Sequence, residues 1–119
     1  MSFVVTQANT VDILLVAGGG GGSQDIAGGG GAGGVLQISS HSLAVGTYNI
    51  VIGSGGNQVT SGVHATAGGN TTALGYTAIG GGPGSGSVDS GFGNTEGDGG
   101  SGGGGGSNKP HGAGTAGPP

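Results

Sequence analysis

The hydrophobic positions along the chain fall into short runs, and long stretches almost free of apolar side chains separate them. The strongest run, residues 11–17, reads Val-Asp-Ile-Leu-Leu-Val-Ala and is apolar at nearly every position. A short, β-branched run of this kind is typical of a strand that is buried on both faces. We expect its single carboxylate, Asp12, to lie near the edge of that strand.

Further strand patterns follow along the chain. Residues 46–53 alternate between apolar and polar side chains, which places Tyr48, Ile50 and Ile52 on one face of a strand. The remaining strand predictions are residues 35–39, 70–74 and 76–79, the last two joined at Gly75. Together these patterns predict a small β-module.

Glycine blocks fill the stretches between the strands. Residues 18–22 leave the first strand, a polar tip follows at residues 23–25, and residues 28–34 return toward the next strand. Two structures are open to such a segment: a flexible linker, or extended left-handed helices with three residues per turn that pack side by side and bond backbone to backbone. Because strands hold both ends of residues 18–34, we expect packing there. For residues 97–106, which are anchored at one end, both alternatives stay open.

The whole pattern predicts a mainly β fold with irregular structure and no α-helix. We expect a small β-sandwich-like module in which the glycine-rich tracts are packed polyglycine helices of the polyproline II type. Composition divides the chain into residues 1–79, the β-module with inserted glycine tracts, and residues 80–119, a glycine-rich C-terminal region.

Composition limits how such a fold can be stabilised. The 119 residues include 37 glycines, and hydrophobic residues make up 31% of the chain. Each glycine loses about 0.5–1 kcal/mol more in conformational entropy than alanine would, so a small core must be supplemented by other contacts. The chain has no cysteine, which excludes disulfides and thiolate metal sites. We therefore expect copies of the chain to associate.

Charge is sparse and mainly acidic, with five Asp and Glu residues and the single base Lys109. There is neither a basic patch nor an aromatic platform, so nucleic acid is not an expected partner. No apolar run approaches the roughly 18 residues of a membrane span, and the start of the chain lacks the features of a signal peptide. We expect synthesis in a cytoplasm and no membrane insertion.

Residues that could carry chemistry are few and scattered. His41, His64 and His111 have no second ligand at a metal-binding spacing. The glycines at residues 18–22 follow a strand, but they lack the helix and acidic residue of a dinucleotide fold and the Lys-Ser/Thr of a P-loop. We expect no catalytic residue, no metal and no cofactor, and therefore no enzymatic activity.

Three segments, in this order, carry a resemblance to a known family: Val11-Asp-Ile-Leu-Leu-Val-Ala with five glycines after it, Gly28-Gly-Gly-Gly-Ala-Gly-Gly-Val, and Gly46-Thr-Tyr-Asn-Ile-Val-Ile-Gly-Ser-Gly-Gly. The chain resembles the glycine-rich domains of bacteriophage tail fibres, receptor-binding adhesins and related virion proteins. The resemblance implies a β-rich module with packed polyglycine helices, often homotrimeric, in a virion made in the host cytoplasm. It also implies other virion proteins as partners, and exposed loops that bind a host-surface protein or glycan.

The candidate receptor contacts are polar loop tips, because hydroxyl, amide and carboxylate groups can bond sugar hydroxyls. These residues are Ser23, Gln24, Asp25, Asn57, Gln58, Asn94, Thr95 and Glu96. Ordinary solvated turns have the same composition. Two other functions stay open: a capsid or tail decoration or cement protein that binds no receptor, and an ice-binding protein of polyproline II helices, for which regular repeats are lacking.

Overall fold

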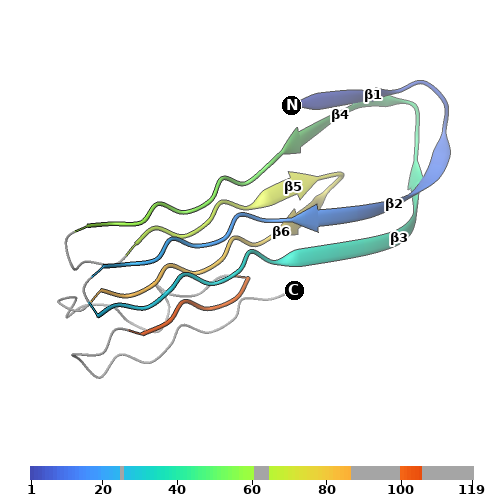
Figure 1. Cartoon of the computed structure of the whole chain (residues 1–119). Coiled ribbons are helices and arrows are strands. Elements are labelled where there is room, and N and C mark those ends of the chain that lie inside the picture. The colour runs from blue at the N-terminus through green and yellow to red at the C-terminus, as the bar shows by residue number, and fades with distance from the viewer. Residues whose placement is uncertain (25, 61–64, 87–99, 106–119) are drawn as a thin grey trace.

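The computed structural model describes residues 1–24, 26–60, 65–86 and 100–105, and within them it contains strands and irregular structure but no helix. The strands are β1 (Ser2–Val5), β2 (Asn9–Val16), β3 (Val35–Leu43), β4 (Gly46–Val51), β5 (Thr71–Ala73) and β6 (Tyr76–Ala78). Figure 1 shows these strands gathered at one end of the molecule, with the glycine-rich tracts running side by side to the other end. The predicted mainly β fold is confirmed.

The strands form two antiparallel sheets. One has the order β1-β4-β5-β6, and the other consists of β2 and β3 alone. In the first sheet Phe3 lies opposite Tyr48, and the two rings stack with centroids 5.5 Å apart. Leu74 and Gly75 join β5 to β6, and both have positive φ, 54° and 83°. Two positive φ values are what a tight hairpin turn requires, which explains the glycine at this position.

A β-bulge interrupts the pairing of β2 with β3. Val11 lies opposite His41 and Ile13 opposite Ile38, so Asp12 alone faces the two residues Ser39 and Ser40. Ser40 has a left-handed φ of 57°, and its N–H donates to the Asp12 carboxylate over 3.0 Å. The prediction that Asp12 lies near the strand's edge is wrong, because β2 begins at Asn9 and Asp12 is therefore an interior residue of the strand.

The core lies where β2 and β3 pack on β5 and β6. Its buried members are Leu15, Ala17, Ala73 and Ala78, with Ile13, Leu36, Ile50, Leu74 and Tyr76 partly buried around them. This is the small β-sandwich-like core that the sequence predicts. The prediction that the first strand is buried on both faces is wrong, because Leu14 is 63% exposed and Val16 is 52% exposed. Only one sheet covers β2, so its outward side chains remain open.

Strand boundaries differ from the predictions at both ends of the β-module. β1 was not predicted, since only three apolar residues, Phe3 to Val5, mark it. β4 ends at Val51, so Ile52 lies beyond it and is 64% exposed, while Tyr48 and Ile50 share the half-buried face. The chain leaves the sheet at Ile52 because a glycine-rich tract begins there.

Six tracts form a bundle in two layers. They are tract 1 (residues 17–24), tract 2 (26–34), tract 3 (52–58), tract 4 (65–70), tract 5 (79–86) and tract 6 (100–105). Backbone hydrogen bonds join tracts 3, 1 and 2 in one layer and tracts 4, 5 and 6 in the other, and further bonds join the layers. Because the layers are staggered, tracts 1 and 5 each bond to four neighbours.

Contacts along a tract repeat every three residues. Gly18 and Gly21 donate to tract 4, at Gly69 and Thr66, with distances of 3.0 Å. A Cβ added to Gly18, Gly20 or Gly21 would lie within 2.3 Å of a carbonyl oxygen in a neighbouring tract. Three residues per turn is the repeat of a polyproline II helix. The packed structure predicted for residues 18–34 is therefore confirmed for the described residues 18–24 and 26–34, and residues 100–105 pack in the same way.

Polar side chains join the bundle to the sheets. The buried Thr71 accepts a bond from the Gly53 N–H over 2.9 Å and donates its hydroxyl to the Val16 carbonyl over 2.8 Å. Asn70 accepts from the Gly80 N–H over 2.9 Å. These bonds satisfy backbone groups at the points where the strands end and the tracts begin, so they tie the bundle to the sheets.

Candidate functional site at the tip of the glycine bundle

The topology brings two turns to the bundle end that lies away from the sheets. Tract 1 runs outward from β2 and tract 2 returns to β3, while tract 3 runs outward from β4 and tract 4 returns to β5. Tracts 1 and 3 are parallel neighbours, since the Gly56 N–H donates to the Gly19 carbonyl over 2.8 Å. The last residues of these two tracts, Gln24 and Gln58, therefore lie at the same end of the molecule, which we call the tip.

Ser23 fixes the end of tract 1. Its N–H donates to the Gly28 carbonyl over 3.2 Å, and its hydroxyl donates to the Gly84 carbonyl over 2.8 Å. Serine thus closes the turn and ties it to the second layer. The exposed Gln24 beside it has a longer side chain with an amide that can both donate and accept hydrogen bonds.

Asn57 and Gln58 end tract 3 next to this turn. The Asn57 N–H donates to the Thr66 hydroxyl over 2.7 Å, and its carbonyl accepts from the Thr66 N–H over 3.1 Å. With the Asn57 backbone held in this way, both exposed carboxamides extend from a fixed base. A Cβ on Gly21 would lie 2.3 Å from the Asn57 carbonyl, which shows how closely the two tracts approach.

The structure thus brings four of the eight predicted contact residues to one end of the molecule: Ser23, Gln24, Asn57 and Gln58. The other four, Asp25, Asn94, Thr95 and Glu96, lie outside the described residues. The arrangement found offers the exposed carboxamides of Gln24, Asn57 and Gln58, which can donate and accept hydrogen bonds, while the Ser23 hydroxyl donates to the Gly84 carbonyl.

Sequence reasoning missed Ile26 at the tip. This side chain is 67% exposed, and its backbone has a φ of 52°. A β-branched residue in the left-handed region is an uncommon and costly conformation, and such strain clusters at functional sites. The available signal was its position, since Ile26 and Ala27 are the apolar residues between the glycine blocks of tracts 1 and 2.

The histidine that the structure describes has a structural contact. His41 Nδ1 lies 3.2 Å from the Tyr76 hydroxyl, and the two rings meet edge to face with centroids 5.5 Å apart. This pair links β3 to β6. Among the described residues no group of three His, Cys, Asp or Glu side chains could hold a metal ion. His64 and His111 lie outside the described residues.

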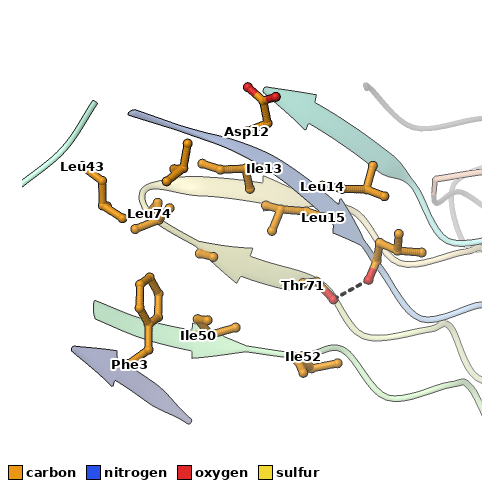
Figure 2. Close-up of a pocket in the computed structure, with 13 residues that line it drawn as sticks. Phe3, Asp12, Ile13, Leu14, Leu15, Leu43, Ile50, Ile52, Thr71 and Leu74 are labelled. Carbon is orange, nitrogen blue, oxygen red and sulfur yellow. Dashed lines mark hydrogen bonds between the residues drawn. The ribbon is translucent and has the colours of Figure 1, made fainter. Parts of the chain in front are cut away.

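An apolar cleft lies at the other end of the molecule, between β2 and β4, with β5 as its floor. It has a volume of about 500 Å³. Figure 2 shows Ile13 and Leu15 pointing toward it from β2, Phe3 and Ile50 lining the opposite side, and Asp12 pointing away. The cleft opens because β4 and β2 diverge before their tracts come together.

In the described part of the chain no helix is long and apolar enough to cross a membrane.

Comparison with known proteins agrees with the composition. The searches of curated proteins and of solved structures gave no match to the chain. The family model of the glycine-rich domain matches residues 2–119, which is nearly the whole length. The chain therefore belongs to the glycine-rich domain family.

Proposed function

We propose that this chain is a structural and adhesive component of a bacteriophage virion, and that it serves as a tail-fibre or receptor-binding tip module. The observation that supports this proposal is the tip itself. Backbone hydrogen bonds hold the tracts of the bundle together, and the bundle presents Gln24, Asn57 and Gln58 at one end. A rigid scaffold with variable end loops is the usual way to build a binding site whose specificity can change without loss of the fold.

The partners follow from the two ends of the molecule. The exposed carboxamide groups at the tip suit a host-surface glycan or the polar surface of a host protein. The sheet end carries exposed apolar side chains, including Met1, Val4 and Val45, which suit other virion proteins and further copies of this chain. A homotrimer in the virion is the assembly that the resemblance implies. The chain acts by binding and has no enzymatic activity.

The test measures binding of the full chain to immobilised bacterial surface polysaccharides and to intact bacterial cells. We expect Gln24→Ala and Gln58→Ala at the tip to weaken binding by about tenfold or more, since each removes a hydrogen-bonding amide from the contact. Gln37→Ala is the matched control, because Gln37 is an exposed glutamine of β3 near the sheet end. Equal losses in all three variants would refute a binding site at the tip.

A decoration or cement protein is the second candidate. It is favoured by the exposed apolar residues of the sheet end, which a purely receptor-binding role leaves unexplained. A cement protein would bind purified virions or capsids and would bind neither polysaccharide nor cells. The same experiment, with virions as a further probe, therefore separates the two functions.

A further inference from the structure

The layer of tracts 3, 1 and 2 has an outer face that can be traced residue by residue. With three residues per turn, one position in three along each tract points away from the neighbouring tracts and from the second layer. Hydrogen bonds between Gly20 and Gly31 and between Gly56 and Gly19 set the register. The outer face therefore consists of the rows Ile52, Val16, Val35; Gly55, Gly19, Ala32; and Gly22, Gly29, with Gln58 at the edge of the third row, where the face meets the tip.

The first row of this face is apolar and open. Ile52 is 64% exposed and Val35 is 59% exposed, and Val16 lies between them. The apolar cleft between β2 and β4 adjoins this row, since Leu14, Val16 and Ile52 also line it (Figure 2). Contiguous apolar patches of this kind on a small protein mark contact sites.

The remaining rows are nearly free of side chains, although the fold of one chain does not require this. A Cβ on Gly29 would meet nothing within 4 Å, and one on Gly19 or Gly55 would come no closer than 3.6 Å to another atom. The exposed Ala32 shows that the face accepts a side chain. Glycine at such positions costs conformational entropy without relieving a clash, so the packing inside one chain does not account for it.

Electrostatics permit two such faces to meet. Asp12 is the one charged side chain in the part of the chain that the structure describes, and its carboxylate accepts the Ser40 N–H at the bulge, away from the cleft. None of the residues in the three rows carries a charge. Bringing together two copies of the face therefore buries no charge, which is the usual obstacle to a contact between identical surfaces.

We propose that this outer face is the contact between two copies of the chain, packed face to face with their tips at the same end. A twofold rotation about an axis parallel to the tracts relates the two copies. It places the apolar row of one copy against the apolar row of the other, and the glycine rows against each other. The two layers within one chain already pack backbone against backbone in this way, with Gly20 against Gly82. The inference rests on the self-association in the proposed function, but a face-to-face contact of two identical surfaces has twofold symmetry, so it gives a dimer in place of the homotrimer that the resemblance implies.

A second copy explains the balance of apolar residues. Among the described valine, leucine, isoleucine, methionine and aromatic residues only Leu15 and Leu43 are buried, while Val16, Val35 and Ile52 remain open in one chain.

The test measures the mass of the full chain in solution by light scattering over a dilution series. We expect a dimer that Gly29→Gln and Ala32→Gln convert to a monomer, with at least a tenfold weaker association and with the unfolding temperature of the dissociated wild-type chain, because the stabilisation that association adds is lost. Ala67→Gln is the control, because Ala67 is exposed in tract 4 of the other layer. Ala32→Gln replaces no glycine, so it tests the contact even if Gly29→Gln fails to fold.

Two outcomes would overturn the inference: a wild-type chain that is monomeric at every concentration, or face variants that associate as well as Ala67→Gln does. Polysaccharide binding by the monomeric variants is measured in parallel. If the monomeric variants still bind polysaccharide, the tip functions without the contact between copies. Failure of this inference therefore changes the mass in solution, whereas failure of the adhesive function changes polysaccharide binding.

Discussion

At the scale of the residue, the glycines that face a neighbouring tract are required by close approach and not by an unusual backbone angle. A Cβ on Gly20 would lie 2.0 Å from the Gly82 carbonyl oxygen, and one on Gly30 would lie 2.1 Å from the Gly20 carbonyl oxygen. Neither glycine has the positive φ that would by itself exclude other residues. These contacts let backbones bond directly, and the Gly20 N–H donates to the Gly31 carbonyl over 2.8 Å.

Two alanine substitutions should therefore have opposite effects. Gly20→Ala drives a methyl group into backbone that cannot yield, and we expect it to lower the free energy of unfolding by at least about 2 kcal/mol. Gly29→Ala places its methyl in open space and restricts the unfolded chain, so it should raise that free energy by about 0.4–1 kcal/mol. Calorimetric unfolding of both variants checks this. Similar effects of both variants would mean that the tracts are linkers.

At the scale of the element, the sequence predicts the strands better than it predicts their neighbours. The alternation in residues 46–51 and the short apolar run before tract 1 are local signals, and the structure contains both strands. The pairing of β4 with β1 and β5 depends on the whole fold. The sequence predicts that both faces of β2 are buried, because Leu14 and Val16 are apolar. No local pattern shows that a second sheet is missing from the outward face of the strand.

The tracts show the same limit more strongly. Their packing follows from the number of consecutive glycines between anchored strands, but their order in the two layers cannot be predicted, because one polyglycine segment is chemically identical to another. The tip residues Ser23 and Gln24 were identifiable because they interrupt glycine. Ile26 was missed because its significance lies in a backbone angle and an exposure that sequence does not show.

Hydrogen exchange should reveal the threefold repeat directly. In tract 2 the N–H groups of Gly28, Gly31 and Gly34 donate to tract 5, over 3.0, 2.8 and 2.7 Å. The N–H groups of Gly29 and Gly30 have no such bond among the described residues. We expect slow exchange at every third amide and fast exchange between, as measured by NMR on labelled protein. Uniformly fast exchange along this tract would contradict the packed helix.

At the scale of the whole molecule, stability comes mainly from backbone hydrogen bonds and only to a small extent from apolar burial. The buried apolar residues described are Leu15, Leu43 and four alanines: Ala17, Ala65, Ala73 and Ala78. Six tracts, in contrast, exchange backbone bonds across two layers. A domain of ordinary composition has the reverse balance, with a large apolar core. The bundle can hold its tip rigid because its regular bonding does not depend on which side chains the loops carry.

This balance predicts an unusually small heat-capacity change on unfolding. Exposure of apolar surface raises heat capacity and exposure of polar backbone lowers it, and ordinary domains show about 12–15 cal/mol/K per residue. Because unfolding here exposes mainly polyglycine backbone, we expect less than about 8 cal/mol/K per residue. Calorimetry over a range of unfolding temperatures measures this heat-capacity change. The monomeric variant Ala32→Gln is used, so that apolar surface buried between copies does not contribute to the value. An ordinary value in that variant would mean that an extensive apolar core, and not the backbone of the tracts, stabilises the fold.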